Sequence, residues 1–169
     1  YFKAGNNDGS CARNYGYSVA KDGDTIAIGS PGDCSNQTGV TNGTTASSDD
    51  SIAGAGAVYV YRLNNSTWTQ EAYIKADAAA SYGFGKTLSL DNGTLAVGGR
   101  GYVWVFTRSG TNWSQEAKLT ADTGSITAYG DLFGLSVSLS GDTLAVGSVN
   151  DDSNQTTITN TDNSSSTNS

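Results

Sequence analysis

Histidine is absent from this 169-residue sequence, and its absence excludes several kinds of catalytic chemistry. Without imidazole there is no serine–histidine triad, no histidine general base and no histidine metal ligand. Paired carboxylates, as in glycosidases, are the alternative that remains. Asp24 and Asp142, however, hold the same position in copies of an internal repeat, which favours a role in turns over a unique catalytic pair. We therefore predict a protein that is not an enzyme.

Basic residues and long apolar runs are also scarce. The chain has 9 Lys and Arg against 16 Asp and Glu, so no basic stripe is available to neutralise phosphates or anionic lipid headgroups. No segment approaches the roughly 20 apolar residues that a membrane span needs. Tyr1 begins β-like sequence rather than a charged and then apolar signal. We expect a mature, soluble protein that binds no nucleic acid and does not insert into membranes.

Cysteine is limited to Cys11 and Cys34, and no cluster of metal ligands accompanies them. Few charges and many Ser and Thr residues fit an exported protein better than a cytosolic enzyme, so we predict an extracellular or cell-surface location. The two cysteines flank the first pair of expected strands and share one rim of an up-and-down sheet. A disulfide there would close a loop of about 23 residues and contribute about 3 kcal/mol. Two free thiols are the alternative.

An internal repeat is the main feature of the sequence. Residues 15–29 recur as residues 133–147, and a third copy runs from residue 84 to residue 98. A second module, residues 56–76, is matched without a gap by residues 101–121. Because a repeat dictates the architecture, the rest of the fold prediction depends on it.

Each full unit contains four short β-rich runs, and the Asp-Gly, Asn-Gly and Ser-Gly pairs between the first two favour tight hairpins. The unit therefore predicts a four-stranded antiparallel meander. Residues 58–61 and 103–106 are apolar at every position, so both faces of each sheet must be covered. Large and small residues alternate along residues 25–29, as expected where sheets crowd together near an axis. The predicted fold class is all-β, with stacked blades that form a partial β-propeller.

The Phe84-Gly85 opening, the strand at residues 95–98 and the Gly-Ala-Val-Tyr-Val run from Gly56 resemble FG-GAP repeats. Such repeats build the propeller of integrin α subunits and of many bacterial surface proteins. The resemblance covers nearly the whole chain. It implies propeller blades, an extracellular location, and contact with a ligand or matrix rather than catalysis, although fold alone does not establish function.

Many FG-GAP repeats carry an Asp-x-Asp-x-Asp-Gly calcium loop, and this spacing does not occur here. Acidic residues do lie in the corresponding long loops, but without the alternate oxygens that wrap calcium. We interpret them as solvated loop acids and predict no metal or other cofactor, with calcium as the alternative. These residues are Asp33, Asp49, Asp50, Asp151 and Asp152.

The repeat divides residues 1–169 into parts of a single propeller segment. We predict a lone last strand with a loop in 1–14, a first blade in 15–76 with a long loop at 30–55, a second blade in 77–121, and an incomplete third blade with a Ser/Thr/Asn-rich tail in 122–169. Two full blades and one incomplete blade cannot form a closed ring by themselves. Either the segment belongs to a larger array, or copies complete one another head to tail as a filament.

Open strand edges at both ends predict adjoining blades or copies of this chain as partners. Residues 155–161 are β-branched enough for a third strand and equally suit a flexible linker. We predict a structural or adhesive protein. The alternative is a lectin-like module that binds carbohydrate or protein through rim tyrosines, of which Tyr15, Tyr17, Tyr82 and Tyr129 are candidates.

N-glycosylation sequons are frequent, and several lie in expected loops or hairpin turns. Asn65 and Asn92 also suit tight turns, because asparagine tolerates left-handed backbone angles. We predict sugar at some of the loop sites. The sequons begin at Asn36, Asn42, Asn64, Asn65, Asn92, Asn112, Asn154 and Asn163.

Overall fold

The computed structural model describes residues 2–5, 11, 14–80, 82–120 and 132–149. The first sheet holds β1 (Ser18–Asp22), β2 (Thr25–Ser30), β3 (Val40–Asn42), β4 (Ala57–Asn64) and β5 (Thr67–Ile74). The second sheet holds β6 (Thr87–Asp91), β7 (Thr94–Gly99), β8 (Tyr102–Ser109) and β9 (Asn112–Thr120). A hairpin holds β10 (Ser136–Ser140) and β11 (Thr143–Gly147). No helix occurs in this described part, and so none there could cross a membrane.

The strands follow the repeat. The orders β1-β2-β4-β5 and β6-β7-β8-β9 are antiparallel meanders, which confirms the predicted fold class. Both meanders even shift register at the same repeat position, after Val60 in β4 and after Val105 in β8. A bulge of this kind increases the local twist of the strand.

The first sheet has an additional strand that the repeat does not predict. β3 lies within residues 30–55, which the sequence suggests as a loop, and pairs Val40 with Ile74 at the outer edge of β5. Residues 2–4, which the sequence suggests as a last strand, belong to no strand. Instead the Phe2 ring packs against Tyr61 and Trp68, with centroids 4.8 and 5.7 Å apart. The predicted tail strand at 155–161 lies outside the described residues.

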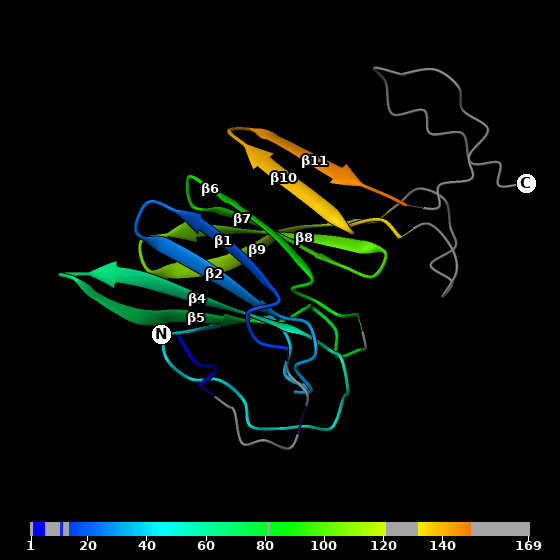
Figure 1. Ribbon diagram of the computed structural model, residues 1–169, viewed down its shortest axis with the longest axis horizontal. Helices are drawn as coiled ribbons and strands as arrows, with labels where there is room; N and C mark the ends of the chain where they lie inside the picture. Colours follow the sequence, from blue (N-terminus) through cyan, green and yellow to red (C-terminus); the bar gives the residue numbers. More distant parts are fainter. Residues whose placement is uncertain (1, 6–10, 12–13, 81, 121–131, 150–169) are drawn as a thin grey trace, which may run out of the picture.

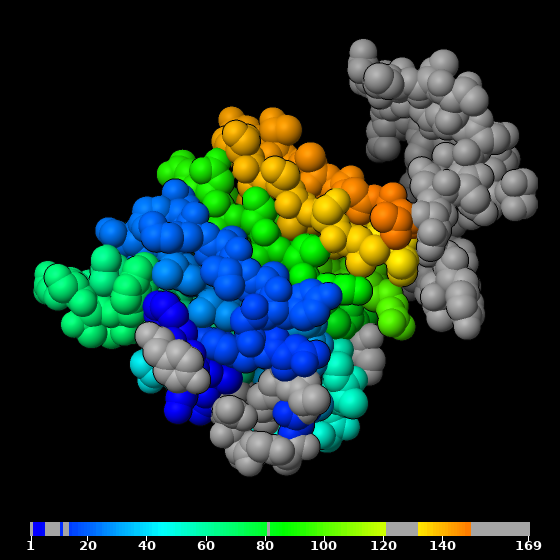
Figure 2. Space-filling model, in the orientation of Figure 1, coloured from blue at the N-terminus to red at the C-terminus, as the bar shows by residue number. Residues whose placement is uncertain are grey.

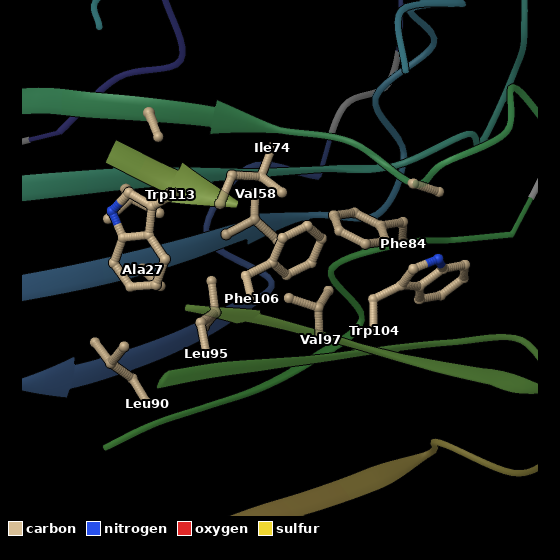
Figure 3. Packing of buried hydrophobic residues seen from close by; sticks show 13 residues of the cluster. Ala27, Val58, Ile74, Phe84, Leu90, Leu95, Val97, Trp104, Phe106 and Trp113 are labelled. Carbon is tan, nitrogen blue, oxygen red and sulfur yellow. The ribbon is translucent and has the colours of Figure 1, made fainter. Parts of the chain in front are cut away.

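The sheets lie face to face, with β1 and β2 against β6 and with β6 and β7 against β10 (Figure 1). Between the first two sheets, Val58 and Ile74 meet Phe84, Val97 and Phe106, all fully buried (Figure 3). Burial of a Phe side chain of this kind contributes about 2 to 3 kcal/mol. This cluster is what holds the two blades together.

The other face of the first sheet carries a second apolar cluster around Tyr59 and Tyr73, both 0% exposed. Phe2, Tyr15 and Ala46, which come from the N-terminal segment and the long loop, pack against it. Both faces of β4 are thus covered, as the apolar run at residues 58–61 predicts.

Candidate functional site: the contact between stacked sheets

The Phe-Gly turn of one sheet touches the end of the second strand of the sheet before it. A Cβ atom on Gly29 would lie 2.1 Å from the carbonyl oxygen of Gly85, and one on Gly98 would lie 2.1 Å from that of Gly134. The turn glycines themselves have φ of +88° at Gly85 and +87° at Gly134, a region that L side chains rarely adopt. Glycine on both sides is therefore what allows the two backbones to approach.

Hydrogen bonds repeat at the same contact. The Ser18 hydroxyl donates to the Gly85 carbonyl at 2.7 Å, and Thr87, its counterpart in the second sheet, donates to the Gly134 carbonyl at 2.9 Å. At the other end of the hairpins, Asp22 accepts from the backbone N–H of Asn92 at 2.8 Å. Its counterpart Asp91 likewise accepts from the backbone N–H of Gly141 at 2.6 Å.

Small residues line the face that each sheet turns toward the next. Ala27 and Ala96 hold the same repeat position and are both 0% exposed. Ala145 is their counterpart in the β10–β11 hairpin and is exposed. Because side chains alternate along a strand, Ala145 shares one face with its partners across the hairpin. This outer face consists of Ser136, Ser138, Ser140, Thr143, Ala145 and Gly147.

The contact between the first two sheets includes a buried carboxylate, that of Glu71. Glu71 of β5 accepts two hydrogen bonds from Arg108 of β8, at 2.6 and 2.9 Å, and a third from the indole N–H of Trp113 at 2.9 Å. Burial alone would raise the pKa of Glu71, but the bonds from Arg108 and Trp113 outweigh it and hold that pKa below its ordinary value. Glu71 therefore stays ionised at neutral pH and ties the sheets together.

This arrangement predicts how stability depends on pH. A carboxyl whose folded pKa is depressed stabilises the fold above its unfolded pKa, and this contribution is lost as pH falls through the folded pKa. The urea midpoint of the wild type should fall on acidification below pH 4.5, the ordinary value for Glu71. The Glu71→Gln variant should start lower at pH 7 and show a shallower fall. Parallel curves for the two proteins would contradict the role of Glu71.

Asp33 does not behave as the solvated loop acid that the sequence suggests. It is 0% exposed, and its carboxylate accepts hydrogen bonds from Lys75 Nζ and the Tyr73 hydroxyl, both at 2.9 Å, and from the Tyr59 hydroxyl at 3.2 Å. Lys75 is itself only 2% exposed. The interpretation of Asp33 as a solvated residue is therefore wrong: it anchors the long loop to the face of the first sheet.

In the second sheet, the counterparts of Tyr59 and Tyr73 contact a different carboxylate, that of Asp77. Trp104, the counterpart of Tyr59, donates its indole N–H to Asp77 at 2.9 Å, and Lys118, the counterpart of Tyr73, lies 3.0 Å from Asp77. The Lys118 ammonium also lies 4.5 Å from the centroid of the Tyr102 ring, which is a cation–π distance. The two donors thus hold matching repeat positions, but the carboxylates do not, since Asp33 follows β2 whereas Asp77 lies between β5 and β6.

The predicted disulfide is present. Cys11 and Cys34 are bonded across a separation of 23 residues, with their Cα atoms 6.4 Å apart. Asp49, another of the loop acids, accepts hydrogen bonds from the backbone N–H groups of Asn36 and Ser51. Among the described residues, no group of three or more His, Cys, Asp or Glu side chains could hold a metal ion. Asp151 and Asp152 lie outside those residues.

All of the sequon asparagines that the structure describes are exposed. Asn42, Asn64 and Asn112 line one polar hollow of about 380 Å³, together with Gln70. The amide of Asn42 is already used there, because it accepts from the Trp113 backbone N–H at 2.8 Å and donates to the Trp113 carbonyl at 3.2 Å. The sequons at Asn154 and Asn163 lie outside the described residues.

The rim tyrosines proposed for a lectin have unequal exposure. Tyr15 donates its hydroxyl proton to the hydroxyl of Tyr61 at 2.9 Å, and the Tyr82 ring packs against Tyr102 and Trp104. Burial, followed by the bond to Tyr61, raises the pKa of Tyr15 above its usual range. Only Tyr17, at 59% exposure, is left open among these described tyrosines, and Tyr129 lies outside the described residues.

The described part of the chain is thus a stack of antiparallel sheets. Glycines allow neighbouring sheets to approach closely, and hydrogen bonds between the sheets recur at equivalent repeat positions. A family model described as FG-GAP repeat matches residues 113–164, so the chain carries an FG-GAP repeat, as the resemblance predicts. No curated protein matches the chain. FG-GAP repeats are propeller-type adhesion or binding modules and are generally not enzymes. Both these repeats and disulfides are typical of extracellular proteins.

Proposed function

We propose that this protein is an extracellular structural or adhesive subunit, not an enzyme, and that it associates end to end with copies of itself by adding one stack of sheets to the next. The observation that carries the proposal is the outer face of the β10–β11 hairpin, which lies at the margin of the molecule (yellow to orange in Figure 2). On this face Ser136 lies opposite Gly147, just as Ser18 lies opposite Gly29 and Thr87 lies opposite Gly98 at the two contacts inside the stack. Ser136 is exposed.

The opposite end of the stack carries the complementary apolar residues. Val19 and Tyr17 are 62% and 59% exposed on the first sheet. Leu88, the counterpart of Val19 in the second sheet, packs into the core between the first two sheets. Val19 is thus exposed at a position whose counterpart, Leu88, is partly buried inside the stack, which favours a protein contact there. Sugars on the exposed sequons, from Asn36 to Asn112, belong to the same proposal of an extracellular location.

Ala145→Arg tests this proposal. The residue is exposed within one chain but corresponds to Ala27 and Ala96, which are fully covered by the next sheet. Sedimentation velocity over a range of concentrations should show reversible self-association of the wild type, while Ala145→Arg stays monomeric with an unchanged melting temperature.

Thr67→Arg is the matched control, since Thr67 is also exposed but is the first residue of β5, next to the turn that joins β4 and β5. This variant should associate like the wild type. A wild type that remains monomeric at the highest concentration, or an Ala145→Arg variant that associates as well as Thr67→Arg, would refute end-to-end association through this face.

A further inference from the structure

Two copies of one tripeptide lie in different surroundings. Residues 42–44 and residues 92–94 both read Asn-Gly-Thr, and they contain the only two Asn-Gly steps of the sequence. Both asparagines are exposed, but Asn42 is the last residue of β3, whereas Asn92 lies in the turn between β6 and β7. Because the tripeptides are identical, a difference in their reactivity reports on the fold around them.

An Asn-Gly step is able to modify itself. The glycine backbone nitrogen attacks the side-chain amide carbon of the asparagine, the bond from that carbon to the amide nitrogen breaks, and the glycine N–H proton leaves with that nitrogen as ammonia. Water then opens the cyclic imide at either of its carbonyl groups, which gives aspartate or isoaspartate. Glycine favours the reaction because it has no Cβ to hinder the close approach. The side-chain amide and the glycine N–H must both be free to meet.

The fold holds both reacting groups at Asn42. The side-chain amide of Asn42 forms a pair of hydrogen bonds with the backbone of Trp113, at 2.8 and 3.2 Å. The Gly43 backbone N–H is held as well, since it donates to the Glu71 carbonyl at 2.6 Å. Trp113 is itself only 2% exposed. Reaction at this step therefore requires local opening of the contact between β3 and the second sheet.

Neither reacting group is held at Asn92. In the described part of the chain, no hydrogen bond engages the Asn92 side-chain amide or the Gly93 backbone N–H. The two residues have φ of +45° and +76° and form a tight turn between the paired residues Asp91 and Thr94. The backbone N–H of Asn92 donates to Asp22 of β1 at 2.8 Å. The reactive step thus lies at a point where the first two sheets are bonded to each other.

We infer that the Asn92-Gly93 turn is a site of spontaneous self-modification, which converts Asn92 to aspartate and isoaspartate and thereby weakens the contact between the first two sheets. Isoaspartate adds a carbon atom to the backbone of the turn and so displaces the N–H group that binds Asp22. Either product also places a new carboxylate close to that of Asp22, and like charges repel. The inference does not depend on the proposed function, because it concerns a contact within one chain.

Peptide mapping by mass spectrometry tests the inference on the whole chain, made without N-linked sugar so that both amides are free. The folded protein is incubated at mildly alkaline pH for several weeks, and the products at the two tripeptides are measured after digestion. Asn92 should be lost at least about tenfold faster than Asn42, because several hydrogen bonds must open before Asn42 reacts. In urea concentrated enough to unfold the chain, the two rates should become comparable.

The second arm of the experiment measures the consequence for the contact. Protein modified at Asn92, separated from the unmodified chain by anion exchange, should unfold at a lower urea concentration than the unmodified fraction of the same sample. Asn92→Gln is the control variant, because its longer side chain would have to close a larger and less favourable ring. This variant should form little of the modified fraction and should keep its urea midpoint throughout the incubation.

Equal rates at the two tripeptides of the folded protein, or faster loss of Asn42, would overturn the inference. The same ratio of rates in urea as in the folded protein would also overturn it, since the difference would then come from flanking residues and not from the fold. An unchanged urea midpoint in the modified fraction would show that the turn does not contribute to the contact between the sheets.

Discussion

Gly98→Ala should destabilise the protein strongly, while the same change at Gly147 should have little effect. The added methyl group on Gly98 would lie 2.1 Å from the carbonyl oxygen of Gly134, which belongs to the next sheet and cannot move without separating the two sheets. Overpacking of this kind typically costs about 1 to 3 kcal/mol, and a clash with backbone places this variant at or above the upper limit. The free energy of unfolding in urea measures the effect.

Gly147→Ala is a matched control because it shares the local surroundings of Gly98. A Cβ atom at either glycine lies 2.1 Å from the hydroxyl oxygen of the facing residue, Thr87 or Ser136, and that side chain can rotate away. Only at Gly98 does the backbone of another sheet stand in the way. Equal losses of stability in the two variants would show that the contact between sheets is not what requires glycine.

Asp33→Asn should be the second severely destabilising change. The substitution keeps the shape of the side chain but removes the negative charge that lies 2.9 Å from the ammonium of Lys75, which is 2% exposed. Loss of one partner from a buried ion pair typically costs about 3 to 5 kcal/mol, because the other charge stays in a poorly solvated site. Urea unfolding at pH 7 measures the loss.

Asp49→Asn controls for a general effect of removing loop charge, because Asp49 lies in the same long loop and accepts hydrogen bonds only from that loop in the contacts described above. The double variant Asp33→Asn with Lys75→Met should recover part of the loss, since it removes both charges. A cost at Asp33 no larger than that at Asp49, or no recovery in the double variant, would contradict a buried pair that anchors the loop.

The repeat made the sheets predictable from sequence. Three copies of the hairpin module and two of the second module indicate the strands and their order, and the Phe84-Gly85 turn indicates where one blade meets the next. The disulfide could also be predicted from the sequence, because Cys11 and Cys34 flank a hairpin whose ends must lie on one rim. Each of these features depends on local pattern or on direct comparison of copies.

Features without a counterpart in the repeat were not predictable in the same way. Asp33 and Lys75 are 42 residues apart, and the second blade has no equivalent pair, so nothing in the pattern joins them. The one available signal was Lys75 itself, a charged residue that follows the apolar Tyr73-Ile74 pair. β3 was missed because its three residues carry little strand signal of their own, and it forms by covering the open edge of β5.

The stacking of the first two sheets can be tested directly in solution by nuclear Overhauser effects between side chains of different sheets. In a sample with labelled valine methyl groups, Val58 and Val60 should show strong cross-peaks to the rings of Phe84 and Phe106, since all four belong to one buried cluster. Figure 3 shows Val58, Phe84 and Phe106 in this cluster. Cross-peaks confined to residues of the same sheet would contradict the stack, and with it the face through which we propose that copies associate.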